Sequence, residues 1–299
     1  MTTLGEVRAK PAKRISGLSR GARIVRSLTF FVPMVIMLGL VFITLFAPLI
    51  APYDPIEQHM LERRLPPSFF EGGTTKYILG TDHLGRDILS RMIYGGRVSL
   101  SVSLLAIMIT AGIGTVMGIA SGYIGGRTDG FLMRLTDIAM SFPGLLIAML
   151  LSVGVGPGFW TVVFALSILG WAGYSRMIRG EALRLRNSDF VMQARVNGVS
   201  NIGIMFKHIF PNVVNTLIII MTLQIGMMIL AESALSYLGI GIPAPTPSWG
   251  SMVSDGRNDL DRAWWISTFP GIAIGLVVLS GNFLGDWIRD KTDPRLRRL

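Results

Sequence analysis

The sequence has no cysteine, only three histidines and little charge. The lack of cysteine excludes disulfide bonds and thiolate metal sites. His59, His83 and His208 are scattered without ligand spacing, so no metal site is expected. Charged residues make up 15% of the chain, against roughly 25% in an ordinary globular protein. That is too little to cover a soluble domain, so we expect a membrane protein whose surface is largely covered by lipid.

The motifs of nucleotide hydrolysis and of catalysis are also missing. No segment matches the phosphate loop G-x-x-x-x-G-K-[ST]. The apolar segments hold no paired aspartates, no serine–histidine pair and no clustered histidines, which argues against an intramembrane enzyme. We therefore expect no catalytic residue and no cofactor in this chain. The energy for any active process would have to come from another chain.

Long uncharged runs predict an all-α fold with about six transmembrane helices. The runs 30–51, 98–126, 208–231 and 263–285 each exceed the roughly 20 residues that cross a bilayer. A fifth run, 138–175, is too long for one span and is interrupted at 154–158 by glycines and a proline, which favour a tight turn. The six spans are predicted near 30–51, 98–123, 135–153, 159–178, 212–232 and 264–286.

The placement of basic residues predicts the orientation of these spans. Of the 28 lysines and arginines, 20 fall on one predicted side, concentrated in 1–29, 176–207 and 289–299. The positive-inside rule places this side, and both termini, in the cytoplasm. We thus expect basic cytoplasmic tails at 1–29 and 289–299 around a transmembrane domain at 30–288. Topology accounts for the net charge of +10, so no nucleic-acid partner is expected.

The cytoplasmic segment 187–212 is predicted to form two short helices. Ser188 suits the cap of the first helix, and Gly198 suits the residue after its end, where a positive φ is needed. The second helix begins near Asn201 and is expected to end at Pro211. By its residues alone, the segment also fits a helix lying in the lipid interface, or an ordinary loop.

Two polar residues of the fifth span are candidates for a transport pathway. Glu232 lies at the outer end of that span, where an ionisable group faces either a cavity or a partner. It also fits a side chain that reaches interfacial water or pairs with an arginine. Gln224 precedes it by two turns, and its amide fits either the pathway or a bond to a neighbouring helix.

Two further patterns concern packing. Gly114, Gly118 and Gly122 recur on one helix face and predict a seam where helix backbones approach closely. The outer segment 80–97 is predicted to be a short amphipathic helix resting on the outer membrane face. It fits packing against the subunit's own spans or contact with a binding protein. Its apolar residues are Ile88, Leu89, Met92 and Ile93, and its charged residues are Arg86, Asp87, Arg91 and Arg97.

Several stretches resemble one family of transporters. Residues 192–211 are similar to the loop of ABC-importer permeases in which Glu-Ala-Ala is followed at fixed spacing by Gly and then Ile-x-Leu-Pro. Ala194, Gly198 and Pro211 match, while Met192, Gln193, His208 and Phe210 depart from the pattern. The rest looks like the C-type permease of dipeptide, oligopeptide and nickel importers. The segments that carry this likeness are GTDHLGRD at 80–87, LSYLGIG at 235–241, PSWG at 247–250, Trp264-Trp265, Phe269-Pro270-Gly271 and Asp293-Pro294-Arg295.

This resemblance implies a type I ABC-importer permease in the bacterial cytoplasmic membrane. Its expected partners are a second permease, forming a heterodimer, two cytoplasmic ATPases that bind ATP and Mg²⁺, and an extracytoplasmic solute-binding protein. The expected cargo is a di- or oligopeptide; nickel, glutathione or an oligosaccharide on the same scaffold stays open, and a secondary transporter is the less favoured class. The residues expected to couple to the ATPase are Asp189, Met192, Gln193, Ala194, Gly198 and Pro211.

Overall fold

The structure is a computed structural model that describes residues 20–292, without the side chains of residues 20–29, 169 and 292. Residues 1–19 and 293–299, most of the two predicted basic tails, lie outside it. The described part is helical and contains no β-strand. Its α-helices are α1 (Arg20–Leu45), α2 (Ala47–Ile50), α3 (Ile88–Ile124), α4 (Gly126–Ser141), α5 (Gly144–Val155), α6 (Phe159–Arg186), α7 (Asp189–Val196), α8 (Asn201–Ile204), α9 (Phe210–Tyr237), α10 (Trp249–Asp255) and α11 (Trp265–Thr292).

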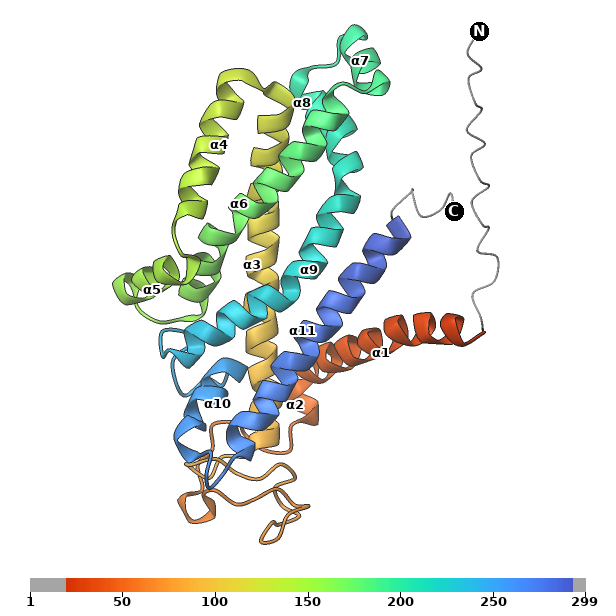
Figure 1. Ribbon diagram of the computed structural model, residues 1–299. Coiled ribbons are helices and arrows are strands. Elements are labelled where there is room, and N and C mark those ends of the chain that lie inside the picture. Colours follow the sequence, from red (N-terminus) through yellow and green to blue (C-terminus); the bar gives the residue numbers. More distant parts are fainter. Residues whose placement is uncertain (1–19, 293–299) are drawn as a thin grey trace, which may run out of the picture.

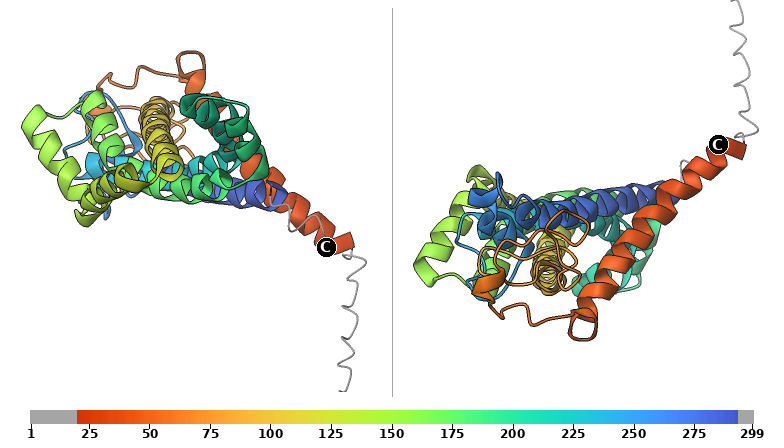
Figure 2. Two further views of the ribbon diagram at one scale, coloured as in Figure 1. Left: turned by 90° about the horizontal axis from the view of Figure 1, so that it is seen from above. Right: turned by 90° about the horizontal axis from the view of Figure 1, so that it is seen from below.

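The helices form an elongated bundle around α3 (Figure 1). One end carries α7 and α8, and the opposite end carries the loop 51–87 together with α10 (Figure 1). Seen along the bundle, α3 stands almost end-on, while α1 and α11 run outward together to one side (Figure 2). The stacked rings of Phe30 and Trp287, with centroids 3.9 Å apart, join these two helices.

Four described helices are long and apolar enough to cross a membrane: α3, α6, α11 and the continuous helix Asn201–Tyr237. The pair α4 and α5 is a fifth candidate, bent by 82°. The apolar part of α1, Phe30–Leu45, is shorter. This arrangement agrees with about six transmembrane segments, and the glycine-rich turn predicted at 154–158 separates α5 from α6.

The segment predicted as a straight span at 135–153 is instead broken between α4 and α5. Phe142 ends α4 in an extended conformation and Pro143 precedes α5. A proline disfavours the helical conformation of the residue before it, which explains a break at this position.

The segment 80–97 does not form a separate helix on the membrane face, contrary to the prediction. Residues 80–87 form a loop, and α3 begins at Ile88 and continues for 37 residues. Asp87 caps α3 by accepting a hydrogen bond from the Ser90 backbone N–H at 2.7 Å. Of the four charged residues that suggested a solvated face, Arg86, Asp87 and Arg91 are buried inside the protein, whereas Arg97 is exposed as expected.

Pro211 does not end the second cytoplasmic helix, again contrary to the prediction. The helix continues from Asn201 to Tyr237, with a π-helical turn at Met205–Ile209 that ends two residues before the proline. A proline inside a helix lacks an N–H and clashes with an earlier carbonyl. The wider π turn relieves this conflict, so the helix passes through Pro211.

The glycine seam on α3 is confirmed as a packing contact with α6. A Cβ atom on Gly118 would lie 2.7 Å from the carbonyl oxygen of Ser175 and 2.9 Å from Cβ of Ile178. Gly114 and Gly122 meet α6 equally closely. Only glycine therefore permits this approach of the two helices.

Replacing Gly118 by valine is expected to destabilise the protein by about 1–3 kcal/mol, because α3 and α6 must separate. A lower midpoint of thermal unfolding in detergent would measure the loss. Gly112 lies on the same helix, and a Cβ atom there would meet no neighbouring atom within 4 Å. Gly112→Val is the matched control, and an equal loss in both variants would contradict the seam.

Candidate functional site

The helix α7 and the bend that follows it form the first candidate site. At the end of α7, the Val199 N–H donates to the Ala194 carbonyl at 3.0 Å and the Gly198 N–H donates to the Arg195 carbonyl at 3.1 Å. Gly198 has φ +78°. These two bonds and the left-handed glycine are a Schellman motif, which ends a helix sharply. The predicted role of Gly198 is confirmed. Ser188 takes the position before the first residue of α7, but its hydroxyl makes no capping hydrogen bond and donates instead to the Leu185 carbonyl at 2.6 Å.

One face of α7 is open to the surroundings. Asp189, Met192 and Gln193 are exposed and follow one another at helical spacing. Val196 completes the face one turn later and is 86% exposed. We call these four residues the α7 face. On the opposite side, Ala194 is buried in the core together with Val191.

The structure thus gathers five of the six predicted coupling residues around α7 and separates the sixth. Pro211 lies in the first turn of α9 and shapes that helix instead. Val196 was not among the predicted coupling residues, although its spacing from Asp189 places it on the same helix face.

The α7–α8 bend is tied to the inner end of α3 through Tyr123. The Tyr123 hydroxyl donates a hydrogen bond to Oδ1 of Asn201, the first residue of α8, at 2.9 Å. The guanidinium of Arg195, in the last turn of α7, lies 5.7 Å from the centroid of the Tyr123 ring. No sequence pattern pointed to Tyr123, because both contacts arise only when distant segments fold together.

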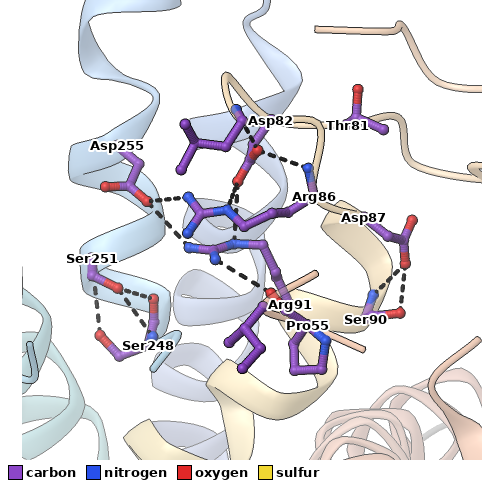
Figure 3. Close-up of polar contacts among 12 residues, drawn as sticks. Pro55, Thr81, Asp82, Arg86, Asp87, Ser90, Arg91, Ser248, Ser251 and Asp255 are labelled. Atoms are coloured by element: carbon purple, nitrogen blue, oxygen red, sulfur yellow. Dashed lines mark hydrogen bonds and ion pairs between the residues drawn. The ribbon is translucent and has the colours of Figure 1, made fainter. Parts of the chain in front are cut away.

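A buried ionic cluster forms the second candidate site (Figure 3). It involves α10, at the end of the bundle opposite α7 (Figure 1). The Arg86 Nε atom donates to Asp82 at 2.6 Å. The Asp255 carboxylate of α10 accepts hydrogen bonds from the guanidinium groups of Arg91 at 3.2 Å and Arg86 at 3.4 Å. Asp82 and both arginines are almost completely buried, whereas the Asp255 side chain is 35% exposed. Two positive and two negative charges thus join the loop 80–87, α3 and α10.

The loop 51–87, on the side predicted to be extracytoplasmic, is held in place by a second polar group. Glu62 accepts hydrogen bonds from Lys76 at 2.7 Å and from the Tyr77 hydroxyl at 2.5 Å. Both bonds lower the pKa of Glu62 below its ordinary value, and the bond from Lys76 lowers it more than the bond from Tyr77. Nearby, burial raises the pKa of the Asp87 carboxyl that caps α3. The outer end is therefore a folded cap rather than an extended loop.

The two predicted pathway residues have different surroundings. Glu232 is completely enclosed and accepts a 2.8 Å hydrogen bond from the Ser236 hydroxyl, so it has no surface open to a pathway in this conformation. The side chain of Gln224 forms no hydrogen bond within the described residues and lines a hollow of about 330 Å³ between α5, α6 and α9. The other residues of this hollow are Gly144, Leu145, Ala148, Leu166, Gly170, Met227, Met228 and Ala231.

Comparison with known proteins identifies the family. Residues 114–298 match the family of the binding-protein-dependent transport system inner membrane component. The chain belongs to this family. Residues 22–67 of this permease also match the N-terminal transmembrane domain of oligopeptide transport permease C. The chain is therefore an ABC-importer permease and a multi-pass protein of the bacterial inner membrane. Such permeases work with a separate ATPase and a binding protein.

The permease is similar to curated relatives over most of its length. It is 40% identical to the di/tripeptide transport system permease protein of Pseudomonas aeruginosa over 264 residues, 88% of this chain and 87% of the relative. It is 37% identical to the oligopeptide transport system permease protein of Bacillus subtilis over 267 residues, 89% and 86% of the two chains. It is 36% identical to the glutathione transport system permease protein of Pectobacterium atrosepticum over 261 residues, 87% and 85% of the two chains.

Proposed function

We propose that this chain is the permease subunit of an ATP-driven importer of di- or oligopeptides. The observation that carries the proposal is the exposed α7 face on a glycine-terminated helix at the predicted cytoplasmic end. The names of the relatives support a peptide cargo. The relative named for glutathione fits the same class, because glutathione is itself a small peptide. None of the three relatives reported above is named for nickel or an oligosaccharide.

In this proposal the energy comes from two partner ATPases that bind ATP and Mg²⁺. The α7 face docks on one of them, and a second, related permease docks on the other. Met192 and Val196 supply exposed apolar area, 49% and 86% of their surfaces, beside the polar Asp189 and Gln193. An apolar centre with a polar rim is the usual composition of a specific protein interface.

The test is purification of the tagged chain from its native membrane, followed by reconstitution in liposomes. A second permease and ATPases are expected to co-purify, and uptake of a labelled dipeptide is expected to require both ATP and the binding protein. Competition with unlabelled tripeptide, glutathione, a nickel complex and an oligosaccharide would identify the cargo. Uptake by the chain alone without ATP would contradict the proposal and indicate a secondary transporter.

We further propose that Gln224 contacts the peptide during passage. Its amide carries both a donor and an acceptor, which match the two polar groups of a peptide bond whatever the side chains of the cargo. Gln224 lies 13 residues before the outer end of α9, about 20 Å along the helix axis. At that depth an amide without a partner is costly in lipid, so a polar ligand or water must reach it.

Replacing Gln224 by leucine is expected to raise the dipeptide concentration for half-maximal uptake about two- to tenfold, the effect of losing one hydrogen bond. Met227 lines the same hollow and offers the control Met227→Leu, which is expected to leave uptake unchanged. Unchanged uptake by the Gln224→Leu transporter would remove Gln224 from the pathway.

A further inference from the structure

The contacts between the α7–α8 bend and the core converge on one side chain. Tyr123 is 3% exposed. The guanidinium of Arg195, which precedes Gly198 in the chain, lies over the Tyr123 ring. The Tyr123 hydroxyl donates a hydrogen bond to Asn201, which follows Gly198. Because these two partners stand on opposite arms of the bend, Tyr123 holds both arms in a fixed position relative to α3.

Tyr123 itself is held by a stiff element. It is the penultimate residue of α3, whose 37 residues measure about 55 Å along the axis. That length exceeds the hydrocarbon core of a bilayer, about 30 Å. The glycine seam locks α3 against α6, and at the far end Arg91 joins the ionic cluster. A displacement of Tyr123 therefore moves α3, a helix that extends to the ionic cluster at the opposite end of the bundle.

The remaining contacts of α7 lead to elements other than α3, and the Ser188 hydroxyl before α7 donates to the Leu185 carbonyl of α6 at 2.6 Å. The chain connects α7 to α6 through Asn187 and Ser188, which gives one route into the bundle. Val191 and Ala194 pack in the core through apolar contacts, which permit small sliding movements. A hydrogen bond and a cation–π contact depend on distance and angle. Tyr123 thus forms the specific link from the bend to α3.

We propose that Tyr123 is the positioning residue through which movement of α7 is transmitted to α3 during transport. This inference rests on the proposed function, because it takes α7 as the ATPase contact. When the ATPase displaces α7, Arg195 and Asn201 move together and carry Tyr123, so that α3 follows. Without this contact, the ATPase still binds and hydrolyses ATP, but a smaller fraction of the α7 movements shifts α3 and imports a peptide.

The test uses the complete transporter with its ATPases and binding protein in liposomes, and measures peptide imported per ATP hydrolysed. Tyr123→Phe keeps the ring for Arg195 and removes only the hydrogen bond. It is expected to lower this ratio about two- to tenfold, with ATPase co-purification unchanged. Tyr123→Leu removes both contacts and is expected to lower the ratio further.

A matched control is Tyr237→Phe. The Tyr237 ring also faces an arginine, Arg257 at 5.6 Å, and its hydroxyl forms no hydrogen bond in the described part of the chain. The ratio is expected to stay at the wild-type value. A double-mutant cycle adds specificity. Asn201→Ala removes the same hydrogen bond from the other side, so Tyr123→Phe with Asn201→Ala should be no worse than either single change.

The outcomes separate this inference from the proposed function. A wild-type ratio in both Tyr123→Phe and Tyr123→Leu, with ATPases bound, would overturn the role of Tyr123 and leave the proposed function standing. Additive losses in the double variant would also overturn it. If wild-type protein recovers no ATPase, the proposed function fails first. Should Tyr123→Leu not fold, Tyr123→Phe and Asn201→Ala decide the question.

Discussion

Replacing Met192 and Val196 together by aspartate is expected to abolish co-purification of the ATPases and reduce ATP-driven uptake to background. Both side chains are exposed on the α7 face, so the changes should not disturb folding of the isolated chain. In an assembled importer the two carboxylates would be buried without partners. Loss of a central interface contact costs about 2 kcal/mol or more. Two such losses weaken binding about a thousandfold.

The control for this experiment is Ile202→Asp. Ile202 is 66% exposed and lies on α8 at the same end of the bundle, outside the α7 face. This variant is expected to retain its ATPases. Normal recovery of ATPases by the double-aspartate protein would show that α7 is not the docking element.

Replacing Arg91 by methionine is expected to cost about 3–5 kcal/mol of stability, because it leaves buried carboxylates short of positive charge. Arg91 is 3% exposed and pairs with Asp255 and Asp82. A loss of this size is a large part of the total stability of a typical domain, about 5–15 kcal/mol. The measurement is the thermal unfolding midpoint of the detergent-purified protein, together with its folded yield.

Arg262→Met is the matched control for Arg91. The Arg262–Asp261 pair is 3.7 Å apart and its side chains are 81% and 75% exposed. Surface pairs of this kind contribute about 0–1 kcal/mol, so little change is expected. The double variant of Arg91→Met with Asp255→Asn should recover part of the stability, since it removes one unpaired charge. Equal midpoints for Arg91→Met and Arg262→Met would contradict the structural role of the cluster.

Proline positions show why the sequence alone leaves helix continuity undecided. Pro143 and Pro211 both lack an N–H, yet α4 and α5 bend by 82° at the first, while the helix 201–237 runs through the second. Ile209 and Val213, on both sides of Pro211, are fully buried in one core cluster, which holds the helix on a single course. Phe142 and Leu145, on both sides of Pro143, are exposed. Packing therefore decided which proline broke its helix.

Local sequence patterns were enough to predict most of the apolar spans, the glycine seam and the residues that bound α7, because each depends on residues close together in the chain. Hydropathy, helical spacing and the conformational freedom of Gly198 are local properties. Helix packing, in contrast, set three features that local patterns do not reveal. Asp82, Arg86 and Arg91 are buried beside Asp255, Glu232 is enclosed, and Tyr123 joins both arms of the bend. The hydrogen bonds of Tyr123 with Asn201 and of Arg86 with Asp255 link residues 78 and 169 positions apart. Such long-range pairings are set by how whole helices pack, which local patterns do not specify.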